Sequence, residues 1–451
     1  MSRASSTRQP ASPGSPAKTH GAHAAPRRPA LNLGPKASMA LLASILISLL
    51  ASSSAPTPLY AIYQQHWGFS PITVTVVFGT YAVAVLAALL VFGRVSDHLG
   101  RRPVLLMALL VQILGMVVFI TAGDVATLLV GRVLQGLSTG AAVGALGAGM
   151  LDIDAPRGGF LNSFAPTMGT ASGAFASGLI VQYLPAPTHL VYVLLLVVFA
   201  VQALGVVALN ETVTRKPGAL TSMVPEFKLP ASARASVAIA VPVIFAVWAL
   251  AGLYGALGPA ITRTLVHSDS VVWGGLPLFV IAGCAGLSVI ALRTTPTRTT
   301  MLVSIGTLVT GVTITLLSIG SGTGGTLSVI GFFVGGAISG VGFGSGFQGG
   351  IRLVIPQVEP HERAGVLSLL YVVCYVGLGV PAVIAGVLVV HGGGLIDTSR
   401  EYGIAVIVLA LAALAGLLAR GRRVDEVQRL SVVRSQDVPS GEASVAEVAE
   451  V

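Results

Sequence analysis

The sequence contains few charged residues. Asp, Glu, Lys and Arg make up only 10% of its 451 residues, whereas 54% are apolar and the mean hydropathy is +0.86. A soluble domain carries roughly 25% charged residues and could not bury this much apolar surface in its own core. The formal net charge of +9 is spread between apolar segments rather than gathered in one stretch. The composition therefore predicts a membrane protein and does not favour nucleic-acid binding.

Cysteine is scarce as well. Cys284 and Cys374 each stand alone in an apolar stretch, so neither a disulfide framework nor a metal site is expected. The chain has no phosphate-binding loop and no His-Glu-x-x-His sequence, and its eight histidines fall in tails, loops or helix ends. These absences argue against ATP hydrolysis, a membrane enzyme or a cofactor. No added signalling domain is visible, which disfavours a non-transporting membrane sensor.

Twelve stretches are long and apolar enough to cross a bilayer as helices, since a span needs about 20 such residues. Six fall in each half of the chain. In the first half they are Ser38–Tyr60, Ile72–Phe92, Pro103–Ala122, Val125–Leu151, Gly159–Leu184 and His189–Leu209. In the second half they are Ala235–Thr262, Val271–Leu292, Thr300–Ile319, Leu327–Ile351, Ala364–Val390 and Tyr402–Leu418.

The polar stretches divide the chain into two bundles and two tails. We expect a disordered N-tail over residues 1–37 and a disordered C-tail over 421–451. The longest polar interruption, 210–233, is the expected linker between a first bundle at 38–209 and a second at 234–420. Basic residues gather in the tails, the linker and alternate loops. This bias predicts a multi-pass protein of the inner (plasma) membrane with both termini in the cytoplasm.

The two halves of the chain resemble each other weakly. The fifth predicted span opens with Arg157-Gly-Gly-Phe-Leu, and the eleventh opens with Arg363-Ala-Gly-Val-Leu. Leu-Tyr60-Ala ends the first span, and Leu-Tyr254-Gly lies late in the seventh. Repeated halves with a binding site between them are a device of secondary transporters.

The most specific motif lies between the second and third spans and reads Gly93-Arg-Val-Ser-Asp97-His-Leu-Gly100-Arg101-Arg102. It resembles the loop signature of the major facilitator superfamily, Gly-x-x-x-Asp-x-x-Gly-Arg-Arg/Lys, at every key position. The resemblance implies an all-α membrane protein of two six-helix bundles related by a pseudo-two-fold axis. It also implies that Gly93, Asp97, Gly100, Arg101 and Arg102 form a gating loop that latches the bundles together in the outward-facing state. A carboxylate at this place can pair with arginine or accept backbone N–H bonds at helix ends.

A second motif lies in the fourth span. Gly131-Arg132-Val-Leu-Gln135-Gly136 resembles the Arg-x-x-Gln-Gly motif of the same superfamily, which implies a cavity-lining Arg132 tied to substrate or to proton coupling. Gln135 shares its helix face. The alternative is an arginine near the outer helix end that snorkels to the headgroups.

The fifth span contains an imperfect third motif. Gly169, Gly173 and Gly178 resemble the antiporter signature of efflux members, but Ala174 and Ser177 replace a proline and a glycine of that pattern. The small residues needed for close helix packing remain. The motif therefore favours efflux over uptake.

Polar and aromatic residues inside the spans are the candidates for a substrate cavity. Ser53, Thr57 and Tyr60 recur at i, i+4 and i+7, and a polar face in lipid is expected to point inward. The other candidates for the substrate or coupling cavity are Arg132, Gln135, Trp248, Tyr254, Gln348, Tyr371 and Tyr375. Contacts between helices, or an interfacial aromatic belt, are the alternatives.

No Asp or Glu falls in the middle of a predicted span. Because a buried cation needs a countercharge in a low-dielectric cavity, the expected substrate is a small neutral or anionic, partly apolar molecule. If a proton is coupled to transport, its site would be Asp97 or the substrate itself. The expected function is secondary active transport across the lipid bilayer by alternating access, carried out by a monomer, with efflux favoured. The alternative is an uptake symporter of the same fold.

Overall fold

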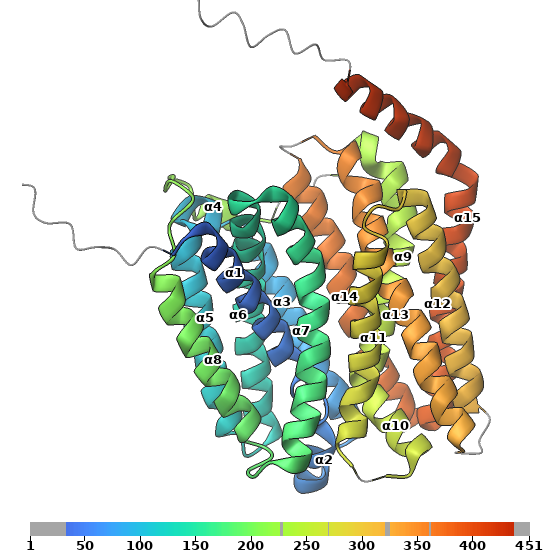
Figure 1. Cartoon of the computed structure of the whole chain (residues 1–451). Coiled ribbons are helices and arrows are strands. Elements are labelled where there is room, and N and C mark those ends of the chain that lie inside the picture. The colour runs from blue at the N-terminus through green and yellow to red at the C-terminus, as the bar shows by residue number, and fades with distance from the viewer. Residues whose placement is uncertain (1–32, 226–228, 269, 321–324, 360–361, 437–451) are drawn as a thin grey trace, which may run out of the picture.

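The computed structural model describes residues 33–436, apart from 226–228, 269, 321–324 and 360–361. Over these residues the chain is helical, and twelve helices of at least 18 residues form two bundles (Figure 1). Each bundle holds six of them, which confirms the all-α, two-bundle fold predicted from the sequence.

The long helices of the first bundle are α1 (Pro35–Ser54), α3 (Pro71–Phe92), α5 (Arg101–Ile120), α6 (Val125–Ile153), α7 (Ala155–Tyr183) and α8 (Leu190–Val207). Those of the second bundle are α9 (Arg234–Ala256), α11 (Val272–Ala291), α12 (Thr297–Gly320), α13 (Thr326–Val354), α14 (Arg363–His391) and α15 (Gly394–Gln436). The short helices are α2 (Tyr60–Trp67), α4 (Ser96–Leu99) and α10 (Gly258–Val266), with 3₁₀ turns at Thr221–Met223, Ala231–Ala233 and Ile355–Gln357. We call the end of the molecule where α1 begins the terminal face, and the end that carries α2 and α10 the opposite face (Figure 1).

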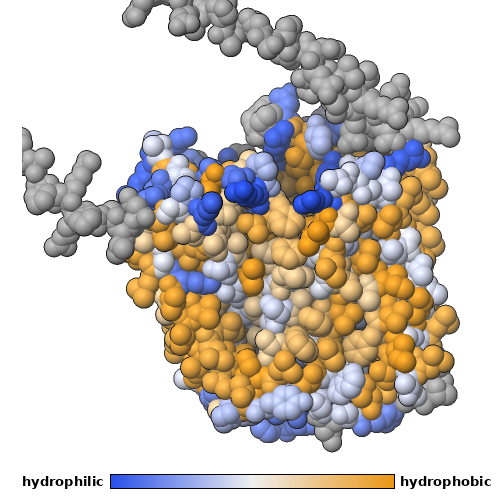
Figure 2. Space-filling view, in the orientation of Figure 1, coloured by the Kyte–Doolittle hydropathy of each residue, from blue (hydrophilic) through white to orange (hydrophobic). Residues whose placement is uncertain are grey.

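On the side of the molecule shown in Figure 2, apolar side chains form a broad belt between polar residues at the two faces. Met107 of α5, Leu204 of α8 and Leu317 of α12 are 62%, 73% and 70% exposed. Such exposure suits lipid rather than water. Eleven of the long helices are long and apolar enough to cross a membrane. The twelfth, α7, is as long but more polar.

The two bundles repeat the same packing. In the first, α3 and α5 pack against α6, and in the second, α11 and α12 pack against α13. Likewise, α1 packs against α7 and α9 packs against α14. Two pairs of helices join the bundles, α7 with α11 and α3 with α14. In the repeat α7 corresponds to α14 and α11 corresponds to α3, so the two pairs are equivalent. The arrangement is that of two related halves around a central interface.

Two predicted spans are wrong at their ends. The first ends at Ser54 rather than Tyr60, because Pro56 lies in the turn at 55–59 before α2 begins, and proline lacks the N–H that continues a helix. The seventh divides at Leu257 into α9 and α10, with Pro259 in the first turn of α10. Both breaks lie toward the opposite face, so the repeat extends to the short helices α2 and α10.

The tails also differ in part from the prediction. The first helix begins at Pro35, within the predicted N-tail, and α15 continues to Gln436, within the predicted C-tail of 421–451. The run from 419 to 436 contains Arg, Leu, Glu and Gln, which favour helix. Residues 1–32 and 437–451 lie outside the described residues.

Candidate functional site

A cavity of about 140 Å³, here called the central cavity, lies between the bundles near the middle of the long helices. The first bundle contributes a polar wall from α1, α3 and α7, and the second contributes an aromatic wall from α9, α13 and α14. The polar wall contains Ser53, Ser54, Thr57, Tyr81, Asn162, Ser163, Thr167 and Thr170. The aromatic wall contains Trp248, Phe343, Phe347 and Tyr375. None of the described lining residues is ionisable near neutral pH, so the cavity can hold a neutral, partly aromatic molecule without an ion pair.

Trp248 is the centre of the aromatic wall. Its ring centroid lies 5.9 Å from that of Phe343, 5.8 Å from Phe347 and 5.4 Å from Tyr375. The Trp248 Nε1 is buried and has no hydrogen-bond partner among the described residues, and neither has the Thr57 hydroxyl on the facing wall. An unpaired buried polar atom is costly and is often found at functional sites.

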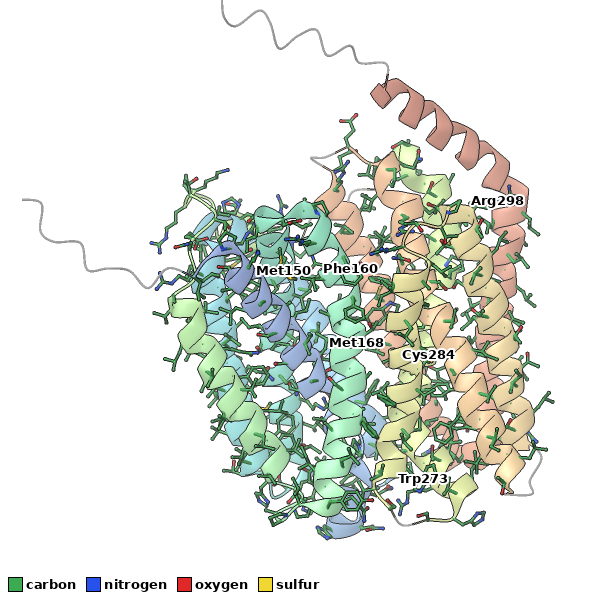
Figure 3. The ribbon with its side chains drawn as sticks, viewed as in Figure 1. Met150, Phe160, Met168, Trp273, Cys284 and Arg298 are labelled. Atoms are coloured by element: carbon green, nitrogen blue, oxygen red, sulfur yellow. The ribbon has the colours of Figure 1, made fainter. Side chains whose placement is uncertain are left out.

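A vestibule of about 430 Å³ adjoins the central cavity toward the terminal face, and the two share Ser163, Thr167, Phe343 and Phe347. Figure 2 shows a notch between the halves at this end of the molecule, and Figure 3 labels Phe160, which lines the vestibule, at the start of α7. Arg293 and Arg352 line the vestibule as well. The central cavity is therefore approached from the terminal face, past two arginines.

Arg352 also ties helices of the second bundle together. Its Nη1 donates to the carbonyl oxygen of Leu292 (3.2 Å) and its Nη2 to that of Arg293 (2.5 Å), at the end of α11. A cation at a helix C-terminus satisfies carbonyl groups that the helix leaves open. Gln348, one turn earlier on α13, lines the same vestibule and donates to the Val289 carbonyl oxygen at 3.3 Å.

Toward the opposite face the bundles are in close contact. A Cβ atom added at Gly275 of α11 would collide with the backbone of Ala174 of α7, and one at Gly386 of α14 would collide with Thr75 of α3. A separate cleft of about 210 Å³ lies beyond this contact, between α2, α3, α10 and α14. Hence the structure is closed toward the opposite face and open toward the terminal face.

Arg132 is buried behind the polar wall and is 1% exposed. Its Nη1 donates to the Ser53 carbonyl oxygen (2.8 Å) and to Gln135 Oε1 (2.7 Å), and its Nη2 donates to the Tyr60 hydroxyl. The guanidinium carbon also lies 5.5 and 5.6 Å from the ring centroids of Tyr60 and Tyr81. Among the described residues no carboxylate pairs with it. Because Ser53 and Tyr81 line the central cavity, Arg132 touches the wall from behind, and direct contact with a substrate stays a prediction.

The remaining predicted cavity residues fall in different places. Ser53, Thr57, Trp248 and Tyr375 line the central cavity together, whereas Tyr60 lines the cleft near the opposite face. The continuous helical face predicted for Ser53, Thr57 and Tyr60 does not exist, because the helix breaks between them.

The other three lie apart from the cavity lining. Gln135 is fully buried in the first bundle and donates to the Ser52 carbonyl oxygen at 2.8 Å. Tyr254 is buried in the second bundle, where its hydroxyl lies 2.9 Å from Thr315 Oγ1. Tyr371 lies on α14, one turn before Tyr375, and is not among the residues that line the central cavity.

The glycines of the antiporter-like motif mark close helix contacts. A Cβ atom added at Gly173 would collide with the backbone of Ala51, and one at Gly169 with that of Ile47, both on α1. Gly178 instead faces Val272 of α11, in the other bundle. The motif therefore lets α7 pack closely on both of its neighbours, as small residues do in membrane helices.

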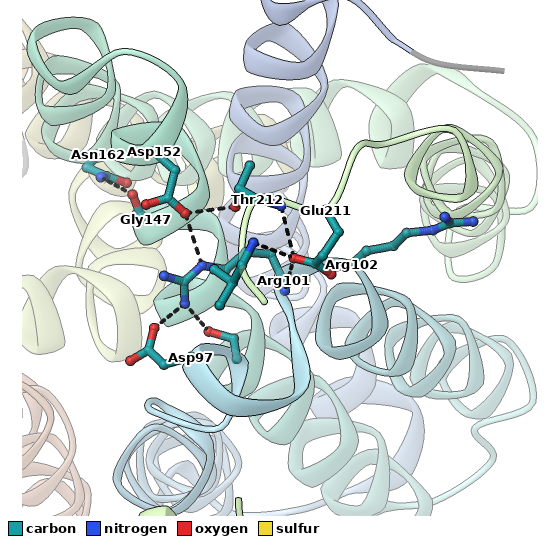
Figure 4. Close-up of polar contacts among 10 residues, drawn as sticks. Asp97, Arg101, Arg102, Gly147, Asp152, Asn162, Glu211 and Thr212 are labelled. Carbon is teal, nitrogen blue, oxygen red and sulfur yellow. Dashed lines mark hydrogen bonds and ion pairs between the residues drawn. The ribbon is translucent and has the colours of Figure 1, made fainter. Parts of the chain in front are cut away.

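The gating loop forms a polar cluster at the terminal face (Figure 4). Arg101, whose side chain is 9% exposed, donates through Nη1 to the Asp97 carboxylate and to Ser96 Oγ (2.7 Å), and through Nε to Asp152 Oδ2 (3.3 Å). Asp97 belongs to the loop, and Asp152 to the last turn of α6. The described contacts of this arginine thus hold the loop against its own bundle.

The linker supplies a residue that the sequence analysis missed. Glu211 Oε1 accepts from the Arg101 backbone N–H (2.8 Å) and Oε2 accepts from that of Arg102 (3.1 Å), at the start of α5 (Figure 4). Gly100, just before, has φ of +102°, and a Cβ atom there would collide with the Glu211 carboxylate. Glu211, rather than Asp97, is the carboxylate that accepts backbone N–H bonds here.

The polar lining of α7 was also missed. Asn162, Pro166 and Thr170 line the cavity at intervals of four residues, with Thr167 beside them. Four-residue spacing places these residues on one helical face, and this signal was readable in the sequence. These polar residues contribute to α7 being the one long described helix that is not apolar enough to count as a membrane span by composition.

Two bundles around a cavity that opens to one face define a helical membrane transporter. A model of the Major Facilitator Superfamily matches residues 41–335, and the chain belongs to this superfamily. The nucleoside transporter NupG is similar in structure, with a TM-score of 0.63, 13% identity, and coverage of 85% of this chain and 99% of that one. The POT family transporter PepTSo is similar too, with a TM-score of 0.67, 12% identity, and coverage of 86% and 99%. At such identities the likeness shows the fold alone. The protein is a membrane transporter and not an enzyme.

Proposed function

We propose that this protein is a secondary active transporter that exports a small neutral or anionic, partly apolar molecule by alternating access. The central cavity supports a neutral substrate over a cationic one, because none of its described lining residues is ionisable near neutral pH. A cation in a low-dielectric cavity needs a countercharge, and a neutral molecule does not. Arg293 and Arg352 in the vestibule add positive charge on the approach and favour an anion over a cation.

The proposed orientation places the terminal face on the cytoplasmic side of the plasma membrane. Basic residues of the described chain gather at this face, namely Arg94, Arg101, Arg102, Arg157, Lys216, Arg234, Arg293, Arg298, Arg352 and Arg363. Only Arg263 and Arg400 lie near the opposite face among the described residues. Cytoplasmic loops carry such an excess of Lys and Arg. Labelling of a cysteine introduced in each face, from each side of the membrane, tests the orientation.

Export is supported by the packing of the antiporter-like glycines of α7. Gly169 and Gly173 pack on α1 as the small residues of that signature would. An uptake symporter of the same fold is the second candidate, and the open terminal face is compatible with either direction. If a proton is coupled to transport, no carboxylate in the middle of a described membrane helix can carry it, which leaves Asp97 or the substrate.

Transport by inverted membrane vesicles tests the proposal. Aromatic compounds of matched size, neutral, anionic and cationic, are offered with and without a proton gradient, the cations being ethidium and tetraphenylphosphonium. We expect accumulation of neutral or anionic compounds and little of either cation. Trp248→Ala should abolish the accumulation of the neutral or anionic compounds. The matched variant Trp67→Ala, on α2 outside the cavity, should not. Strong energy-dependent accumulation of a cation would contradict the proposed substrate charge, and uptake only into right-side-out vesicles would contradict export.

A further inference from the structure

The two bundles share a hydrogen-bonded contact near the opposite face. Gln182, in the last turn of α7, accepts through Oε1 from the Val271 backbone N–H (2.9 Å) and from the Ser270 hydroxyl (3.1 Å). Both donors stand directly before α11, so one side-chain oxygen of the first bundle binds the N-terminal end of a helix of the second. Trp273, labelled in Figure 3, marks this end of α11.

Small residues bring the two helices close enough for this contact. Gly178, one turn before Gln182, lies against Val272, and Gly275 lies against Ala174 without room for a Cβ atom. Because the backbones approach this closely, the side-chain oxygen of Gln182 reaches the backbone N–H of Val271, the residue that caps α11. An N–H group at this position has no acceptor four residues earlier within its own helix, so a side-chain oxygen satisfies it.

At the pseudo-symmetric contact between α3 and α14, no such bond is described. Ser70, which stands before α3, makes no side-chain cap, and Pro71, the first residue of α3, has no N–H to donate. The two helices meet instead through Thr75 and Gly386. A directional polar contact is therefore described on only one of the two seams that join the bundles.

We propose that Gln182 is a clasp that holds the opposite face closed, so that its hydrogen bonds form in the state seen here and break when that face opens. In the transport cycle it is the counterpart of the gating loop at the terminal face. The proposal rests on alternating access, but on neither the substrate nor the direction of transport. Exposed hydrogen bonds are individually weak, yet the two states of a transporter can differ by only a few kcal/mol.

The experiment measures the distance across the vestibule mouth by pulsed electron paramagnetic resonance, which needs no substrate. Spin labels are attached after Gly159→Cys and Thr294→Cys, which line the vestibule from opposite bundles, in a background with Cys284→Ser and Cys374→Ser. A Cβ atom at Gly159 meets nothing within 4 Å, so the label is tolerated. The long distance reports the state that is open toward the terminal face.

Three variants distinguish the effect of the Gln182 hydrogen-bond acceptor from the effect of the side chain's size. Gln182→Leu keeps the size and removes the acceptor, and we expect the ratio of long to short distances to fall about two- to tenfold. Gln182→Glu keeps an oxygen acceptor and places a negative charge at a helix N-terminus, so the ratio should be preserved. Gln202→Leu removes a glutamine that bonds Ser44 and Ser48 inside the first bundle, and it should leave the ratio unchanged. An unchanged ratio in Gln182→Leu would overturn the proposal, and so would an equal fall in Gln182→Glu or in Gln202→Leu.

Discussion

Replacing Glu211 by alanine removes the cap of α5. Its two carboxylate oxygens accept from the backbone N–H groups of Arg101 and Arg102, the first two residues of the helix. The N–H of Gly100 already bonds a carbonyl of α4, and the third helical residue, Pro103, has no N–H. Glu211 therefore satisfies the N–H groups that the first turn leaves open. A segment of the linker thus stabilises the start of the helix that follows the gating loop.

The loss of a helix cap costs about 0.5–2 kcal/mol. Glu211 is exposed, so solvent weakens its bonds. We expect Glu211→Ala to cost about 1 kcal/mol and, in a chain of 451 residues, to lower the melting temperature by about 1 °C. Glu211→Gln keeps one oxygen acceptor and should therefore lose less stability than Glu211→Ala. Thermal unfolding of the purified protein in detergent measures both. Glu401→Ala is the matched control, because Glu401 is an exposed glutamate for which no hydrogen bond is described.

A double-mutant cycle with Gly100→Ala makes the test specific. At φ of +102° and ψ of 155°, an alanine is strained by about 1–3 kcal/mol whatever surrounds it. Its Cβ atom also collides with the Glu211 carboxylate, but only when that carboxylate is present. Gly100→Ala should therefore cost less in the Glu211→Ala background than in the parent. Equal costs in both backgrounds, or unchanged melting of Glu211→Ala, would refute the capping role.

Three further predictions concern other contacts. Asp97→Asn should impair transport of any compound that the parent moves, at an unchanged protein level in the membrane, because it weakens the pairing with Arg101; normal rates would contradict the gating role. The Thr127 hydroxyl and backbone N–H lower the pKa of Asp124, so this cap of α6 should persist at neutral pH and be lost only as the pH falls through that lowered pKa. Hydrogen exchange at the start of α6 should rise in Asp124→Ala and not in Asp124→Asn. Gly173→Leu should destabilise the protein by about 1–3 kcal/mol, measured by melting, because α1 leaves no room for a side chain.

The long helices were predictable because a membrane span depends on the length of an apolar run, and these runs are plain in the sequence. The breaks in the helices after Ser54 and at Leu257 were not predictable, because a proline inside an apolar run hardly changes the hydropathy of that run. Whether a helix continues through such a residue depends on what replaces the lost hydrogen bond, and that is settled by neighbouring helices.

The site was predictable only in part, for a similar reason. Tyr254 and Tyr375 both stand in apolar spans of the second half, yet Tyr375 lines the cavity and Tyr254 packs inside its bundle. Spacing shows which residues share a helical face but not which neighbour that face meets. Glu211 lies 110 residues from Arg101 in the chain, so no local pattern could have linked them.

Two opposing effects decide how the cavity treats cations. The rings of Trp248, Phe343, Phe347 and Tyr375 attract a cation by about 0.5–2 kcal/mol. Arg132 lies behind Ser53 and Tyr81 with no described carboxylate to neutralise it, and its charge is shared only with neutral acceptors and ring faces. A unit charge acting over about 10 Å at an effective dielectric constant of about 20 contributes about 1–2 kcal/mol. The repulsion is thus of the same size as the ring attraction, so the two together leave the hydration that a cation loses on entry uncompensated. A neutral molecule keeps the contact with the rings and has no charge to dehydrate. An anion does lose its hydration, but the charge of Arg132 attracts it, so the combined field of this cavity favours neutral and anionic molecules over cations.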